Sequence, residues 1–294
     1  MFVPPSPPGK RSKLAEGGRT FREGESGRQR TLRRRQRTLR RIPRELGGAA
    51  RRDAFYTAPE GSMNDPRKLF VDKRLTGRCV FCGAKPDTRD HCPSKVLLDE
   101  PFPSNLPVVL ACRGCNQSFS KDEEYLACVL ECVICGSTDP SLVRRANVSR
   151  ILLGKPQLAN QIAVSMVVDG AGGKSWNVDM DRIRNVIIKL ARGHLDYELS
   201  VQEWGDPDVI EVVPFALMER DGRDFFECPE PGPIAVWPEL GSRAFMRILP
   251  GGDMISDGWL DVQEGRYRYL VGQTDGNFAH IVLSEYLACR VVWR

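Results

Sequence analysis

The chain has 294 residues, of which 41% are hydrophobic, enough to pack a core in one large or two modest domains. Its net charge of +5 is uneven: residues 1–60 carry 16 Lys and Arg against 6 acidic residues (+10), which leaves 27 against 32 (−5) for the rest. Global charge therefore does not by itself support nucleic-acid binding by the body of the protein. No run approaches the ~18 apolar residues of a membrane span, so we expect a cytoplasmic protein with no membrane partner.

Residues 1–62 form the first predicted segment, and they are rich in Pro, Gly, Arg and Ser. Because such a composition buries too little apolar surface to order a chain, we predict a basic, disordered segment. One interpretation is a flexible arm that holds DNA phosphates. The interpretation that we favour is a dispensable or untranslated tail, since Met63 opens a plausible start of its own.

Two CxxC pairs follow, Cys79 with Cys82 and Cys112 with Cys115, and 29 residues separate the pairs. This spacing is typical of a four-cysteine zinc site, in which each pair directs two thiolates to one side of a tetrahedral ion. Disulfides and unrelated core thiols are the alternatives, but nothing in the sequence indicates secretion. We predict a structural Zn²⁺ that supplies folding energy on the order of 10 kcal/mol.

The segment between the pairs predicts a strand ending at His91, a proline-rich loop, a second strand within residues 106–111 and a helix opening near Asn116. The predicted order is thus strand, strand, helix (ββα). Strict alternation along a strand would direct Asp90 and His91 to opposite faces. Pro93, which cannot donate to a strand ladder, is consistent with a turn of the chain there.

Asp90-His91 before the loop, Asn105 within it and Asn116 after the last cysteine resemble the D-H…N…N variant of the HNH endonuclease family, over residues 75–135. The resemblance implies a ββα-metal fold with four functional residues: His91 as general base, Asp90 and Asn116 as ligands of one catalytic Mg²⁺ or Mn²⁺, and Asn105 as the structural residue that orients the base. Many members carry a second His where this chain has Asn116. Two oxygen ligands suit a hard divalent cation.

These residue types fit the hydrolysis of a DNA phosphodiester. A neutral imidazole, whose ordinary pKa is near ~6.5, can take the proton of the attacking water at cellular pH. Four basic residues are candidate phosphate contacts: Arg89, Lys95, Arg113 and Lys121. RNA is an alternative substrate. The alternative function is a non-catalytic zinc module that binds nucleic acid or protein.

Residues 63–138 make up the predicted nuclease module, which ends in a helix over residues 118–136. Ser120 and Glu123 form a possible capping box at its start. Three further cysteines lie on this helix, and we interpret them as core thiols rather than as a second zinc site with Cys92: Cys128, Cys132 and Cys135.

Residues 139–294 are predicted to be an α+β C-terminal region without a motif of its own, which makes the fold class α+β. Helices are predicted at 140–153, 157–168 and 180–191. Strands are predicted at 209–217, 234–237, 244–249, 267–271 and 278–283, with a hairpin turn at 274–277. His194 and His280 sit in no ligand or catalytic spacing, so we interpret both as structural.

Overall fold

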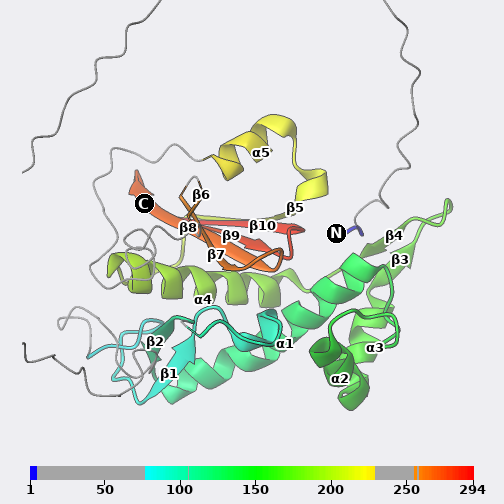
Figure 1. Ribbon diagram of the computed structural model, residues 1–294, viewed down its shortest axis with the longest axis horizontal. Helices are drawn as coiled ribbons and strands as arrows, with labels where there is room; N and C mark the ends of the chain where they lie inside the picture. Colours follow the sequence, from blue (N-terminus) through cyan, green and yellow to red (C-terminus); the bar gives the residue numbers. More distant parts are fainter. Residues whose placement is uncertain (5–76, 105, 229–254, 257) are drawn as a thin grey trace, which may run out of the picture. The chain divides into compact units, whose positions relative to one another are not determined.

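The computed structural model describes residues 1–4, 77–104, 106–228, 255–256 and 258–294 (Figure 1). Contacts divide the chain into two units, Met1–Ser6 with Ser62–Arg294, and Pro7–Gly61. The second unit lies outside the described residues, as do Asn105 and the strands predicted at 234–237 and 244–249. The described part mixes helices and strands, so its fold class is α+β. None of its helices is both long and apolar enough to cross a membrane.

The first elements are two short strands and a long helix. Strand β1 (Thr88–His91) pairs antiparallel with β2 (Val108–Ala111), and the short 3-10 helix η1 (Lys95–Leu97) lies between them. In this register His91 lies opposite Val108. Helix α1 (Arg113–Cys135) follows directly. The predicted order of strand, strand and helix is therefore the observed one.

Helix α1 begins five residues before the predicted start at Ser118, because Cys112 and not Ser120 is its N-cap. The Cys112 Sγ accepts a hydrogen bond from the backbone N–H of Cys115 at 3.4 Å, which satisfies one of the free donors of the first turn. Ser120 lies inside the helix and donates to the carbonyl of Asn116. The helix ends where Gly136 takes a left-handed conformation at φ +66°.

The middle of the chain forms three helices and a hairpin. Its elements are α2 (Ala146–Gly154), α3 (Pro156–Val164), β3 (Met166–Val168), β4 (Lys174–Trp176) and α4 (Met180–Leu199). The helix predicted over 157–168 is wrong in its last turn, because Met166–Val168 pairs with β4. The helix predicted over 180–191 continues to Leu199, because its buried face extends to Leu195 and Ser200 provides a left-handed cap.

The C-terminal part of the chain forms a six-stranded antiparallel sheet in the order β5-β10-β9-β8-β7-β6. Its strands are β5 (Val209–Pro214), β6 (Ile255–Ser256), β7 (Trp259–Gln263), β8 (Tyr267–Thr274), β9 (Gly276–Leu283) and β10 (Leu287–Trp293). The predicted hairpin turn joins β8 to β9. Gly276 has φ +124°, and a Cβ there would lie 2.0 Å from the carbonyl oxygen of Trp293, so only glycine fits.

Helix α4 lies between this sheet and α1 (Figure 1). It packs on β8, β9 and β10 with one side and on α1 and β2 with the other. The opposite face of the sheet is covered by η2 (Phe215–Leu217) and α5 (Arg220–Glu227), whose Phe215 and Phe226 join a second apolar cluster with Trp259. The C-terminal region and the predicted nuclease module therefore share one helix as a common core element.

The first residues of the chain also join this core. Phe2 is 2% exposed and exchanges two backbone hydrogen bonds with Trp176, at 3.0 and 2.8 Å. Its ring meets that of Tyr286 edge to face, and the Tyr286 hydroxyl donates to the carbonyl of Val3 at 2.6 Å. A chain that began at Met63 would lack these contacts.

Candidate functional site

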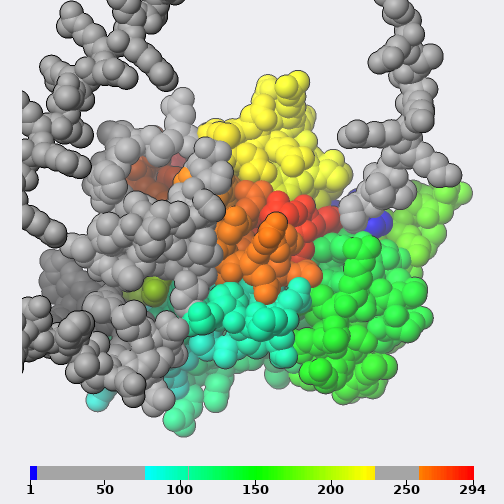
Figure 2. Space-filling view, viewed as in Figure 1, coloured from blue at the N-terminus to red at the C-terminus, as the bar shows by residue number. Residues whose placement is uncertain are grey.

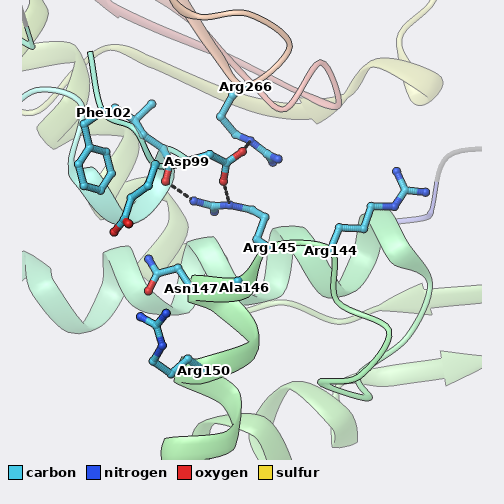
Figure 3. A pocket seen from close by; sticks show the side chains of 10 residues that line it. Asp99, Phe102, Arg144, Arg145, Ala146, Asn147, Arg150 and Arg266 are labelled. Atoms are coloured by element: carbon cyan, nitrogen blue, oxygen red, sulfur yellow. Dashed lines mark hydrogen bonds and ion pairs between the residues drawn. The ribbon is translucent and has the colours of Figure 1, made fainter. Parts of the chain in front are cut away.

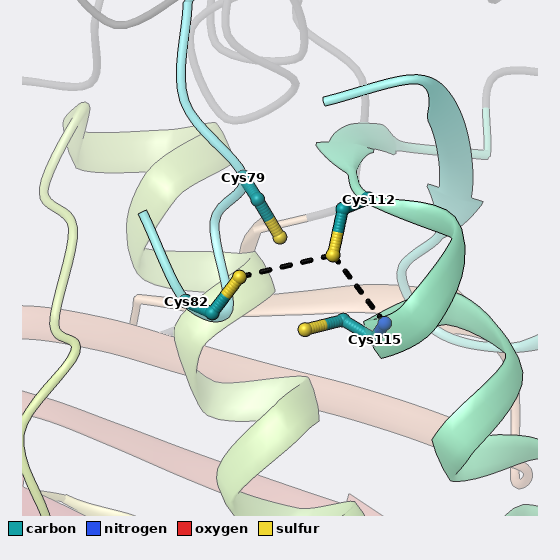
Figure 4. A group of neighbouring side chains, drawn as sticks. All are labelled: Cys79, Cys82, Cys112 and Cys115. Carbon is teal, nitrogen blue, oxygen red and sulfur yellow. Dashed lines mark hydrogen bonds between the residues drawn. The ribbon is translucent and has the colours of Figure 1, made fainter. Parts of the chain in front are cut away.

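The four predicted zinc ligands converge at the start of the module (Figure 4). Their Sγ atoms all lie within 4.8 Å of one another, and those of Cys82 and Cys112 are 3.7 Å apart. The first pair lies on a tight turn in which Gly83, at φ +73°, donates to the carbonyl of Cys79 at 2.8 Å. The second pair lies on the first turn of α1.

This geometry fits a tetrahedral metal centre. With Zn–S bonds of about 2.3 Å, the sulfurs of a tetrahedral site stand roughly 3.8 Å apart. The four cysteines could therefore hold a metal ion such as zinc. Within the described ranges no second group of three or more such ligands is present. On α1, Cys128 and Cys132 are core thiols because both are fully buried, and the half-buried Cys135 packs against the same core.

The thiols of the cluster differ in their tendency to ionise. The backbone N–H of Cys115 stabilises the Cys112 thiolate and lowers its pKa to about 7. Burial raises the pKa of Cys79, and burial with the neighbouring thiols raises that of Cys115. Four crowded thiols thus resist full ionisation without a cation, so metal binding would release protons.

Parts of the C-terminal region buttress the cluster. The Trp204 ring packs against Gly83, where an added Cβ would lie 3.3 Å from it, and the guanidinium of Arg78 lies 5.2 Å from the ring centre. Arg192 of α4 donates to the carbonyls of Trp204 and Gly205 at 3.3 and 2.8 Å. The sequence alone did not predict this support, because Arg192, Trp204 and Gly205 lie far along the chain from the two CxxC pairs.

His91 ends β1 and is half-buried. Burial, then the charges of Lys95 and Lys189, lowers its pKa, while the backbone of Pro107 opposes the shift. The imidazole is therefore neutral near pH 7, the form that can accept a proton. Its Nδ1 is buried and has no hydrogen-bond partner among the described residues. Asn105, which was predicted to orient it, lies outside them.

Asp90 belongs to a buried ionic cluster that sequence reasoning did not foresee. Its carboxylate pairs with Lys189 Nζ of α4 at 2.7 Å. The same ammonium also pairs with Glu123 of α1 and donates to the Ser94 hydroxyl at 2.8 Å. The Lys189 side chain is 1% exposed. The one available signal was a lysine within the apolar face of an amphipathic helix, between Val186 and Leu190.

The cluster has two carboxylates for one ammonium, so Lys189 balances only part of its negative charge. Burial raises the pKa of Asp90, and the Lys189 charge opposes that shift. For Lys189, burial alone would lower the pKa, but the carboxylates of Asp90 and Glu123 raise it overall. The predicted metal ligand Asp90 therefore already has an ammonium as its cation. A divalent metal would have to displace or share this contact.

Asn116 lies in the first turn of α1 and is tied to β1. Its Nδ2 donates to the carbonyl of Arg89 at 3.0 Å and to the Thr88 hydroxyl at 3.3 Å. In this orientation the amide oxygen is the atom left for a metal. Asp90 lies on β1, and Asn116 is hydrogen-bonded to that strand. Among the described residues, however, no contact joins these two predicted ligands, and they share no partner.

The four predicted phosphate contacts are all exposed: Arg89, Lys95, Arg113 and Lys121. Lys95 Nζ lies 5.4 Å from the centre of the Phe102 ring. The backbone N–H of Arg113 donates to Asp87 at 2.6 Å, and the carbonyl of Lys121 accepts from Arg182 at 2.7 Å. Their side chains remain accessible to a ligand.

Comparisons with known proteins do not assign this chain to a family. No family model matches the chain, and no curated protein and no solved structure is significantly similar to it.

Proposed function

We propose that this protein is a metal-dependent endonuclease of the HNH type, which hydrolyses phosphodiester bonds in DNA. The observation that carries the proposal is His91: a half-buried histidine with a lowered pKa at the end of β1, in a strand-strand-helix module beside four clustered cysteines. The cysteine cluster would serve as the scaffold that fixes β1 against α1 through a structural zinc.

In this proposal His91 accepts the proton of a water molecule that attacks the phosphorus. Its lowered pKa keeps the imidazole neutral near pH 7, so the base is ready without prior deprotonation. Asn116 holds β1 against α1 through the Arg89 carbonyl and so fixes the strand that carries the base. The exposed Arg89 and Lys95, which flank His91 in sequence, would hold nucleic-acid phosphates.

The catalytic divalent ion has a weaker fit than zinc. Asp90 and Asn116 would supply one oxygen each, but Asp90 is paired with Lys189. When bound, such an ion would stabilise negative charge on the phosphate and on the departing oxygen. The proposal therefore requires that Lys189 yields or shares the Asp90 carboxylate.

The test is cleavage of supercoiled plasmid by the full chain with Mg²⁺, with Mn²⁺ and without added divalent metal, beside His91→Ala. We expect His91→Ala to keep its fold and zinc content and to lose about 10²- to 10⁴-fold in rate. Below the pKa of His91 the wild-type rate should fall as the pH falls, because the base becomes protonated. A His91→Ala protein that cuts at the wild-type rate would refute the base assignment.

A second candidate is the non-catalytic zinc module that binds nucleic acid or protein. The Lys189–Asp90 pair favours it, because a carboxylate neutralised by a buried ammonium needs no metal. The two candidates differ in the response to metal at equilibrium. If Mn²⁺ or Mg²⁺ raises the melting temperature of wild type and not of Asp90→Asn, a second metal site is present. No shift, together with no cleavage, would select the binding module.

A further inference from the structure

Gly193 lies in the body of α4, where a glycine weakens a helix relative to alanine. The contacts around it give a reason for its presence. A Cβ at this position would lie 2.6 Å from Cys92 Sγ and 3.1 Å from Cys92 Cβ. Ordinary contacts between such atoms are about 3.5–4.0 Å long. Cys92 therefore lies directly against the backbone of α4, at a place that only glycine leaves open.

Cys92 follows His91 in the chain and is 1% exposed. Its thiol donates to the carbonyl of Leu190 of α4 at 3.4 Å, and its Sγ lies 3.6 Å from Nδ1 of His194. Its backbone N–H donates to the carbonyl of Pro107 at 3.0 Å, which continues the pairing of β1 with β2. The end of β1 is thus held between β2 and α4.

Helix α4 is held firmly on the side of the sheet. Nε2 of His194 and the Tyr267 hydroxyl are hydrogen-bonded at 2.7 Å, and the His194 ring stacks on Tyr269 with the ring centres 3.6 Å apart. Both tyrosines are buried residues of β8. The other side of α4 packs on α1. The helix is therefore not free to move away from Cys92.

The segment that follows Cys92 is also fixed. Leu98 is 1% exposed, and Asp99 accepts from Arg145 Nε at 2.6 Å and from Arg266 Nε at 2.9 Å (Figure 3). In Figure 2 the cyan surface of this segment adjoins the green of the middle helices and the orange of the C-terminal sheet. A displacement of Cys92 therefore passes to β1, which belongs to a two-stranded ribbon of only four residue pairs.

We propose that Gly193 is a positioning residue for His91. By leaving room for the Cys92 side chain against α4, it fixes the end of β1 and thereby the imidazole that serves as general base in the proposed reaction. The role of His91 as a base rests on the proposed function. The control of its position by the contact between Gly193 and Cys92 rests only on the packing.

Three variants of the full chain test this contact. Gly193→Ala forces one of the two groups to move by roughly 1 Å, and turning the thiol away is not enough, because Cys92 Cβ also lies too close. Cys92→Ala removes the sulfur. The double variant Gly193→Ala/Cys92→Ala exchanges the sulfur for a methyl group on the other side of the contact, at nearly conserved volume.

The matched control is Gly222→Ala. Gly222 is a helix glycine of α5, and no described atom lies within 4 Å of a Cβ added there. This variant makes the same chemical change in a helix without crowding any neighbour.

The first readout is the NMR signal of the His91 ring at about pH 8, where an imidazole is neutral. The chain has three histidines, so histidine-labelled protein gives three ring signals, and His91→Ala identifies the one that belongs to His91. We expect Gly193→Ala to shift or broaden that signal and the double variant to restore it. The signal of His280, which stacks on Phe226 at the far face of the sheet, should stay in place in both. Gly222→Ala should leave the His91 signal unchanged.

The second readout is plasmid cleavage with Mg²⁺, measured well below the melting temperature of each variant. Because a catalytic group that is misplaced by ~1 Å can cost about 10²-fold in rate, we expect Gly193→Ala to lower kcat by about 10- to 10²-fold with little change in KM. The double variant should recover most of this loss. Cys92→Ala alone should have an intermediate effect, since it loosens the contact without forcing the strand away.

Each outcome decides the proposal. A folded Gly193→Ala protein with the wild-type His91 signal would overturn it. If Gly193→Ala does not fold, the double variant decides: recovery of the fold with the wild-type His91 signal supports the proposal, and recovery without that signal, or no recovery, overturns it. If wild type itself does not cleave the plasmid, the nuclease proposal fails, whereas the NMR comparison still decides whether Gly193 positions His91.

Discussion

The module of β1, β2 and α1 is held together in two places, the cysteine cluster and the buried ionic cluster of Asp90, Glu123 and Lys189. We call these two places fastenings, and they differ in where their cation comes from. At the cysteine cluster, four thiols converge and could hold a cation from solution, which would stabilise their thiolate forms. In the ionic cluster, the carboxylates of Asp90 and Glu123 converge on a cation that the chain itself supplies, the ammonium of Lys189. A metal bound at the first fastening would make it depend on metal, whereas the second depends on how α4 packs and on the charge of Asp90.

The largest expected effect breaks the metal-dependent fastening. Cys112→Ser removes one of the four sulfurs but keeps a side-chain oxygen that can cap α1, so zinc content and stability should fall together through the metal alone, by an amount on the order of 10 kcal/mol if zinc no longer binds at all. Zinc stoichiometry by mass spectrometry and thermal unfolding measure the two quantities.

The matched control for that variant is Cys228→Ser, because Cys228 is exposed and lies outside the cluster. It should change neither quantity. A stable Cys112→Ser protein with a full equivalent of zinc would show that the four cysteines do not form the metal site.

The next effect breaks the fastening that the chain supplies. Lys189→Met leaves Asp90 and Glu123 buried without their cation, which should cost about 3–5 kcal/mol in the free energy of unfolding. Zinc content should stay at the wild-type level. Chemical denaturation measures the loss, with Lys121→Met as the control, since Lys121 is exposed on α1.

The pH dependence of the Lys189→Met variant sharpens this prediction. Burial already raises the pKa of Asp90, and removing Lys189 takes away the charge that opposes the shift. A carboxyl with a raised folded pKa favours the folded state below its unfolded pKa of about 3.9, and this gain is lost as the pH rises through the folded value. The deficit relative to wild type should therefore grow as the pH rises. A deficit that is constant with pH would contradict it.

The smallest effect concerns the residue between the two fastenings. Asn116→Ala removes two hydrogen bonds from α1 to β1, at 3.0 and 3.3 Å. At about 1 kcal/mol for each bond, we expect a loss of roughly 1–2 kcal/mol without loss of zinc. Gln117→Ala, at the exposed neighbouring position, is the control. If the protein is a nuclease as proposed, Asn116→Ala should also need a higher Mg²⁺ concentration.

Features set by nearby residues were predictable from the sequence, and those set by distant partners were not. The spacing of Cys79, Cys82, Cys112 and Cys115 located the cluster, because two CxxC turns can present thiols to one point with little help from the rest of the chain. The start of α1 was misjudged, since a cysteine is an unusual cap. Lys189 lies 99 positions after Asp90, and no local pattern indicated that pair.

The sheet shows the same limit. Strand β10 was missed although Leu287 to Trp293 is a nearly continuous apolar run. Such a run fits a strand buried on both faces as well as a helical segment, so periodicity does not separate them. Its place between β5 and β9, with α4 on one face and the η2 and α5 cluster on the other, supplies the reason for the pattern.

Helix α4 has a consequence for how this module can be transferred to another protein. Lys189 reaches the Asp90 cluster, Arg192 holds the segment beside the cysteines, and His194 contacts Tyr267 of the sheet at 2.7 Å. A fragment that ends at residue 138 would retain every predicted catalytic residue and lose the helix that neutralises one of them. The transferable part is therefore longer than its motif: a graft has to carry residues 180–199 with it, or replace the buried cation by other means.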